Sequence, residues 1–231
     1  MEFLWDGLVQ AFRLVFGGDR QTLHAVYVSL FCTIISVTLA ACLAVPYGAW
    51  LGLYRGRGRR AQVFVVRVGM AVPTVVIGLL VYAFLSRRGL LGSLDLLYTK
   101  AAIFAGETLL AFPLLATLSH AATADLAPEV SESSLTLGAG RFRALLRSLG
   151  EVRSAMAAAY LVSFGRCLTE LGIAITVGGN LAFRTRTLPS TITLELSRGN
   201  FAAALAPGIV LLFLACGAVA IAYRLGGEAR K

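Results

Sequence analysis

The chain has 231 residues, of which 58% are hydrophobic and 14% are charged. This composition excludes an ordinary soluble globular domain and is typical of an integral membrane protein. The formal net charge of +9 would suggest nucleic-acid binding in a soluble protein, but here the basic residues lie mostly between apolar runs. Because no stripe of alternating aromatic and basic residues offers a base-stacking surface, we expect no nucleic-acid partner.

The N-terminal residues 2–16 place apolar side chains at helical spacing and include Trp5. They lack the basic start and the small-residue cleavage site of a signal peptide. We therefore expect a short interfacial helix that lies against the lipid headgroups.

Five apolar runs follow, each long enough to cross a bilayer core of roughly 30 Å as a helix of about 20 residues. They cover residues 24–53, 61–86, 99–123, 154–179 and 201–225. The sequence therefore predicts an all-α, polytopic membrane protein with five transmembrane helices in a single domain, residues 1–231. Pro73 lies near the middle of the second run and predicts a kink there.

The membrane orientation follows from the segment 55–60, which holds four arginines. Positively charged loops tend to stay in the cytoplasm, so we expect this loop, the loop 124–153 and the C-terminus inside. The N-terminus and the segments 87–98 and 180–200 then lie outside. Arginines in the outer segments would attract a dianion, an acidic partner or lipid headgroups; they are Arg184, Arg186 and Arg198.

The loop 124–153 predicts two short helices separated by glycines. The first carries acidic residues in its opening turn, where the helix dipole favours them, and ends at Gly138. The second covers 141–149 and places apolar side chains on one face and arginines on another. Such a pair either lies on the membrane surface or docks onto a partner in water, and the helix–glycine–helix layout favours docking.

The fourth apolar run carries Arg166 and Glu170 at i, i+4 spacing, so both lie on one helix face. Charges inside a span usually face the protein interior and pair, so this is either a structural ion pair or part of a gate. Gly178, Gly179 and Asn180 follow, as a helix C-terminal cap or as a source of backbone N–H groups for an oxyanion.

The sequence lacks motifs for catalysis, metal binding or ATP binding. The chain has only two histidines, no clustered metal-ligand residues and no GxSxG motif, so we expect neither a metal site nor an enzyme. It has no GxxxxGK[ST] loop that would bind ATP. Its four cysteines all lie in apolar runs, as small buried hydrophobes do.

Two sets of residues resemble a known family. Glu132, Ser133 and Ser134, followed after three residues by Gly138, resemble the Glu-Ala-Ala loop of ABC-transporter permeases, with serines in place of both alanines. The stretches 72–92, 164–180 and 184–195 resemble the permease of tungstate-type ABC importers, and the likeness runs from about residue 20 to 225.

The resemblance implies a type I importer permease in the inner, or cytoplasmic, membrane, with the 128–138 segment as a cytoplasmic coupling helix. Glu132, Ser133, Ser134 and Gly138 would contact ATP-binding-cassette ATPase subunits, which bind ATP and Mg while this chain binds no cofactor. Two copies of the chain would form the pathway, and an extracytoplasmic binding protein would deliver the cargo. Path or gate candidates are Arg166, Glu170, Gly178, Gly179 and Asn180.

Two alternatives stay open. The same machine could carry molybdate or sulfate, since these tetrahedral dianions resemble tungstate. A passive channel or a membrane scaffold belongs to a different class, and neither needs an ATPase-docking loop.

Overall fold

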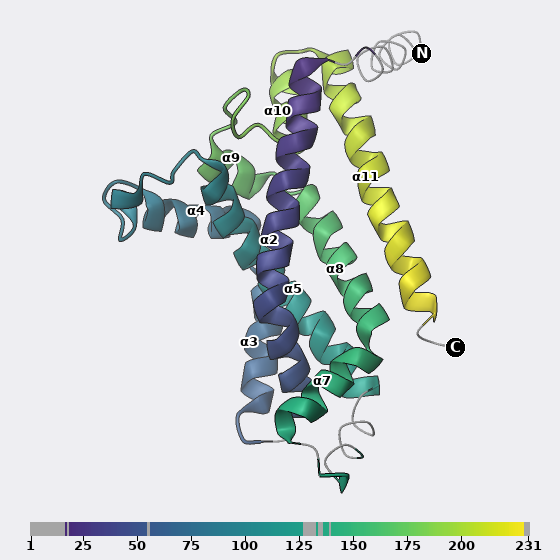
Figure 1. The fold of residues 1–231 in the computed structure, drawn as a ribbon. Coiled ribbons are helices and arrows are strands. Elements are labelled where there is room, and N and C mark those ends of the chain that lie inside the picture. Colours follow the sequence, from purple (N-terminus) through teal and green to yellow (C-terminus); the bar gives the residue numbers. More distant parts are fainter. Residues whose placement is uncertain are drawn as a thin grey trace. The chain divides into compact units, whose positions relative to one another are not determined.

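The computed structural model describes residue 17 and residues 19–54, 56–126, 133, 136–138 and 140–228. Within these residues the chain is helical and contains no strand (Figure 1), which confirms the predicted all-α fold. The α-helices are α2 (Arg20–Leu53), α3 (Arg59–Ala71), α4 (Thr74–Leu85), α5 (Lys100–Leu126), α7 (Arg141–Glu151), α8 (Arg153–Leu168), α9 (Gly172–Gly178), α10 (Leu188–Ser197) and α11 (Phe201–Glu228). A short 3-10 helix, η1, covers Gly92–Leu94. The predicted interfacial helix 2–16 lies outside the described residues.

Among the described residues, three helices are long and apolar enough to cross a membrane alone: α2, residues Lys100–Ala124 of α5, and residues Phe201–Leu225 of α11. The other two predicted spans are each built from two helices. The chain bends by 96° between α3 and α4, and by 59° between α8 and α9. Counting each bent pair as one span gives the five predicted spans. Pro73 predicts the first break, whereas no proline marks the second.

The chain divides into two compact units. The first unit comprises Met1–Ser36, Pro73–Glu107 and Gly165–Gly217, and the second comprises Val37–Val72, Thr108–Phe164 and Ala218–Lys231. The helices α2, α5, α8 and α11 each contribute residues to both units. That all residues belong to one transporter domain stays a prediction.

In the first unit, α4 packs beside α9 through glycines (Figure 1). A Cβ atom on Gly78 would lie 3.1 Å from Cβ of Thr176, and one on Gly172 would lie 3.1 Å from Oγ1 of Thr74. On the neighbouring α5, a Cβ on Gly106 would overlap Ile173. Small residues thus let the short α9 approach both helices closely, as is common between membrane helices.

The first unit also contains the start of α2. The Asp19 carboxylate accepts hydrogen bonds from the backbone N and the Oγ1 of Thr22, both at 2.8 Å, and so caps the helix. Partial burial favours the neutral acid, but these bonds and one from the backbone of Gln21 outweigh it and hold the pKa of Asp19 below its usual value.

In the second unit, α2 packs on α5 through two further glycines. Cβ atoms on Gly48 and Gly52 would overlap Ala116 and Thr123. Arg59, from the predicted cytoplasmic cluster, closes this corner: its Nε donates to the Leu51 carbonyl at 3.1 Å, and its Nη2 lies 3.2 Å from Nε2 of His120. This arginine therefore caps the C-terminal end of α2, in addition to contributing charge to the loop.

Candidate functional site

The break between α8 and α9 is held by the Arg166–Glu170 pair. Nη1 of Arg166 lies 2.9 Å from Oε2 of Glu170, so the ion pair expected from their spacing is present. The other carboxylate oxygen, Oε1, accepts hydrogen bonds from the backbone N of Gly172 at 2.8 Å and of Ile173 at 3.4 Å. Glu170 is only 4% exposed. It therefore satisfies the first N–H groups of α9, which would otherwise be unpaired inside the protein.

A second carboxylate, Glu107 on α5, belongs to the same unit and is 2% exposed. Its Oε2 makes no hydrogen bond with any described residue. Its backbone carbonyl accepts a weak hydrogen bond from Sγ of Cys167 at 3.8 Å. Glu107 is not among the site residues predicted from the sequence, although an acidic residue inside an apolar run is a recognised signal of a functional or assembly site.

The far end of α9 is closed by its glycines. Gly179 adopts a left-handed conformation (φ +69°), and its N–H bonds to the Ile175 carbonyl at 3.0 Å. Thr185 Oγ1 donates to the Gly178 carbonyl at 2.6 Å and accepts from the Leu181 N at 3.1 Å. The N–H groups of Gly179 and Leu181 are thus bonded within the chain, which matches the helix-cap interpretation of Gly178–Asn180 better than the oxyanion interpretation.

Beyond α9, the predicted outer loop 180–200 contains a helix, α10, that the sequence analysis misses. Thr187 and Ser190 form a reciprocal capping box at its start, and Pro189 occupies its first turn. The Leu188 N donates to Oγ of Ser29 on α2 at 2.8 Å, which fixes α10 to the first unit. The Thr187-Leu188-Pro189-Ser190 sequence was the signal that could have predicted this helix start.

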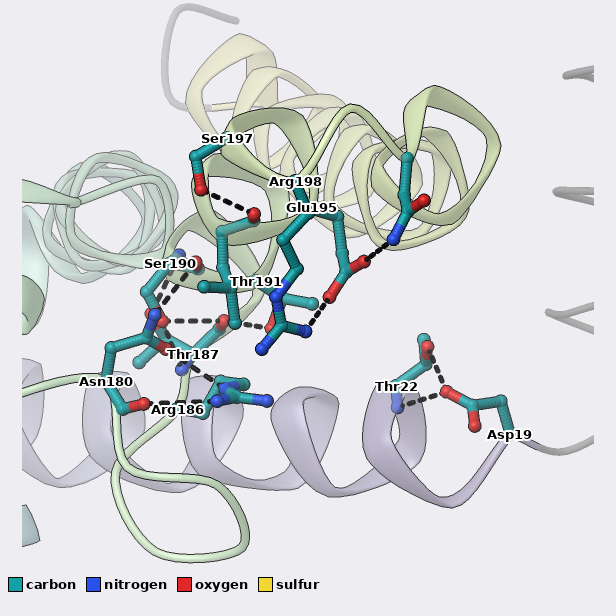
Figure 2. A network of polar contacts seen from close by, with 12 residues as sticks. Asp19, Thr22, Asn180, Arg186, Thr187, Ser190, Thr191, Glu195, Ser197 and Arg198 are labelled. Atoms are coloured by element: carbon teal, nitrogen blue, oxygen red, sulfur yellow. Dashed lines mark hydrogen bonds and ion pairs between the residues drawn. The ribbon is translucent and has the colours of Figure 1, made fainter.

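Figure 2 shows a polar network around α10 that engages two of the three outer arginines. Arg186 Nε donates to Oδ1 of Asn180 at 3.1 Å, and Asn180 Nδ2 donates to the Ser190 carbonyl at 3.4 Å. Arg198 Nη1 pairs with Oε1 of Glu195 at 3.0 Å. Because these two guanidinium groups are already bonded, Arg184, which is exposed, is the better placed of the three to attract an anion.

Another cation lies at the start of α5. The Lys100 ammonium sits 4.7 Å from the ring centroid of Tyr27 and 5.4 Å from that of Phe31, both on α2. The two rings stack, with centroids 5.5 Å apart. These cation–π contacts fix a positive charge at the end of a span without neutralising it.

The predicted coupling loop is described only in part. Glu132 and Ser134 lie outside the described residues. Ser133 and Gly138 are exposed, and Gly138 has a positive φ of 85°, as expected where a glycine ends a helical turn. The second predicted helix is confirmed as α7, which exposes Phe142, Arg143, Leu146 and Arg147.

Comparison with known proteins gives consistent results. Residues 44–227 match the family described as binding-protein-dependent transport system inner membrane component. A tungstate uptake system permease protein, TupB, of Peptoclostridium acidaminophilum is 32% identical over 99% of this chain and 100% of its own length. A probable anion ABC transporter permease of Haloferax volcanii is 34% identical over 85% of this chain and 87% of its own.

A more distant relative is named for a different cargo, and a solved transporter structure has a similar fold. A sulfate transport system permease of Escherichia coli is 29% identical over 78% of this chain and 69% of its own length. A chain from inward-facing structures of the MetNI methionine ABC transporter is 17% identical, with a TM-score of 0.71 over 91% of this chain and 95% of that chain. This structural likeness shows a shared fold.

Proposed function

Since the chain belongs to the family of binding-protein-dependent transport system inner membrane components, we propose that it carries tungstate through the membrane as the permease of an ABC importer. Family membership makes the chain a multi-pass inner-membrane subunit that is itself not an enzyme, as predicted, and it removes the channel and scaffold alternatives. The proposal that tungstate is the cargo rests on the full-length similarity to a tungstate uptake permease.

The proposed assembly contains two copies of this chain, two ATPase subunits and a binding protein on the outer face. ATP and Mg bind the ATPase subunits, and closure of the ATPase pair switches the permease between inward- and outward-facing states. Two copies are proposed because five spans are few for a complete pathway and closed symmetric pairs are the commonest solution. The proposed orientation places the N-terminus outside and the C-terminus in the cytoplasm.

Coupling is proposed to run through the loop 124–153. Glu132, Ser133, Ser134 and Gly138 would contact the ATPase, and the exposed side chains of α7 would extend that contact. Two observations support this: the described loop residues are exposed, and α7 exposes apolar side chains beside arginines. Exposed apolar side chains of this kind mark a contact surface, and the helix–glycine–helix layout of the loop favours a protein partner over the membrane surface.

Gating is proposed at α9. This helix has only seven residues, and it is bounded by Arg166 and Glu170 at one end and by Gly178, Gly179 and Asn180 at the other. A short helix with a defined stop at each end can move as one piece while its flanking helices stay in place. Its glycine contacts with α4 would make that movement common to both helices.

The cargo is tested by reconstituting the chain with its ATPase and binding protein in lipid vesicles. Stimulation of ATP hydrolysis by tungstate at the lowest concentration supports the proposal. Stimulation first by molybdate or sulfate would keep the importer and correct its cargo, an alternative that the sulfate relative favours. Absence of stimulation by all three anions would contradict oxyanion import.

Coupling is tested by Glu132→Lys. A reversed charge in the docking loop should weaken the contact with the ATPase, so we expect transport-coupled ATP hydrolysis to fall about tenfold while the permease stays folded. The measurement is ATP hydrolysis per transported anion, together with co-purification of the ATPase. Normal transport by an intact mutant complex would contradict the docking role.

A further inference from the structure

Two hydroxyl groups meet near the middle of α2. Oγ1 of Thr38, on α2, lies 2.9 Å from Oη of Tyr160, on α8, and both residues belong to the second unit. Thr38 is exposed and Tyr160 is half-buried, so the pair lies at the surface of the chain. The surrounding α2 segment is among the most apolar of the molecule, and it is one of the three helices that can span a membrane alone.

The pair carries one more hydroxyl proton than its shared hydrogen bond uses. Each hydroxyl carries one proton, and the shared hydrogen bond uses one of the two. Among the described residues, neither hydroxyl makes a second hydrogen bond, so one O–H group is left to donate outward. Three residues along α8, on the same face as Tyr160, the buried Oγ of Ser163 also has no partner within the described chain.

This arrangement is a poor fit to lipid. Hydrocarbon accepts no hydrogen bond, so a hydroxyl proton pointing into it costs about 1–3 kcal/mol. The same group facing water or a hydrogen-bond acceptor costs nothing. The surface around Thr38 and Tyr160 is therefore better suited to a hydrated pathway than to the acyl chains.

The charge pattern indicates what would pass. Neither α2 nor α8 contains an Asp or Glu. Rings of carboxylates are one common lining of cation pathways, whereas a tetrahedral dianion offers only acceptor oxygens and is matched by hydroxyl donors. Neutral donors also bind a dianion weakly enough to release it, which conduction requires.

We propose that the Thr38–Tyr160 hydroxyl pair lines the anion path and donates a hydrogen bond to the oxyanion as it passes. This inference rests on the proposed function and assigns it a contact that is distinct from the α9 gate. The pair contributes to recognition because its outward hydroxyl proton matches an acceptor oxygen of the anion.

The first test measures whether Thr38 faces water. The background for this test is the assembled complex with Cys42→Ala and Cys216→Ala, which lacks the two exposed native thiols. Thr38→Cys is introduced into this background and treated with a negatively charged, membrane-impermeant methanethiosulfonate. Leu43→Cys is the control, since Leu43 is 65% exposed on the same helix but lies on a different face. We expect modification of Thr38→Cys, slowed by tungstate, and none of Leu43→Cys. Equal labelling of both, no labelling of Thr38→Cys, or labelling that no oxyanion slows would each overturn the proposal.

The second test measures the contact itself. The double variant Thr38→Val/Tyr160→Phe removes both hydroxyls and keeps the shapes of the side chains, so we expect the tungstate concentration for half-maximal uptake to rise about tenfold, the effect of one lost hydrogen bond to a charged group. Each single variant retains one hydroxyl proton and should lose less. Tyr223→Phe, on an 83% exposed residue of α11, should leave uptake unchanged. Wild-type uptake in the double variant would overturn the proposal. Should the unmodified complex transport none of the three anions, the proposed function fails, while the thiol labelling still reports independently whether the path is hydrated.

Discussion

The chain is interrupted twice inside its apolar segments, and the two interruptions are built from different chemistry. Between α3 and α4 the cause is a single residue: Pro73 has extended backbone (φ −60°, ψ 132°), and no side chain caps the helix that follows. Between α8 and α9 the cause is a contact: the Glu170 carboxylate caps the new helix and is itself held by Arg166. The first break is caused by the local backbone geometry of one residue, and the second is caused by the contacts of two side chains.

Only the second break depends on a side-chain hydrogen-bond acceptor. Proline breaks a helix in any surroundings because its ring fixes φ and removes a donor. A glutamate breaks a helix only when its carboxylate binds the freed N–H groups more favourably than the continued helix would. The two breaks should therefore respond differently to substitution.

The largest expected effect is from Glu170→Ala. It leaves the N–H groups of Gly172 and Ile173 without their acceptor and Arg166 without its partner, at a cost of about 3 kcal/mol in the free energy of unfolding. Because Arg166 is 45% exposed at its side chain, most of the loss is assigned to the N–H groups. Thermal unfolding of the purified complex measures it. Glu170→Gln keeps an acceptor oxygen and should lose less than half as much; equal losses would show that charge alone holds the break.

Gly78→Val should follow in size. Gly78 lies where α4 crosses α9, and an added side chain would meet Thr176 at 3.1 Å from its first carbon. Overpacking of this kind costs about 2 kcal/mol. The measurement is again the unfolding midpoint, with Gly217→Val as the control, since a Cβ there would meet open space. Equal stability of both variants would mean that α4 and α9 do not pack this closely in the membrane.

Pro73→Ala should have a smaller effect, because the α4–α9 contact still holds α4 in place after the proline is removed. Alanine also has more freedom in the unfolded chain, so we expect a loss of about 1 kcal/mol. A loss as large as that of Glu170→Ala would contradict the division into one break made by geometry and one made by contacts.

The smallest expected effect is from Glu107→Gln. The amide has the shape of the carboxyl group and no charge to desolvate, so stability should change by less than about 0.5 kcal/mol. Glu107→Ala, which leaves a cavity in the buried site, should cost about 2 kcal/mol. A large loss in the glutamine variant, measured by the same unfolding assay, would show that Glu107 has an ionic partner.

The sequence predicts more of the fold than of the site. Span positions follow from apolar run length, and the α3–α4 break follows from Pro73, because both are local properties. The i, i+4 spacing of Arg166 and Glu170 predicts their ion pair, but it cannot reveal that Glu170 also caps α9, since that bond forms only after the helix has stopped. Likewise, Arg186 and Arg198 read as free charges in the sequence because α10 was not predicted. Once α10 forms, Glu195 and Arg198 lie at i, i+3 spacing, and the turn before α10 brings Arg186 to Asn180.

The buried carboxylate on α5 has a consequence for how the chain is made. A helix carrying an acidic residue inside its apolar run partitions into a bilayer less readily, by up to about 2.5–3.5 kcal/mol on insertion scales for a residue at the helix centre. Until its neighbours close around it, α5 therefore exposes Glu107 to lipid. In the folded chain Glu107 is only 2% exposed, so the packing of neighbouring helices removes this insertion penalty. Through this one side chain, stable insertion of α5 depends on the helices that pack around it.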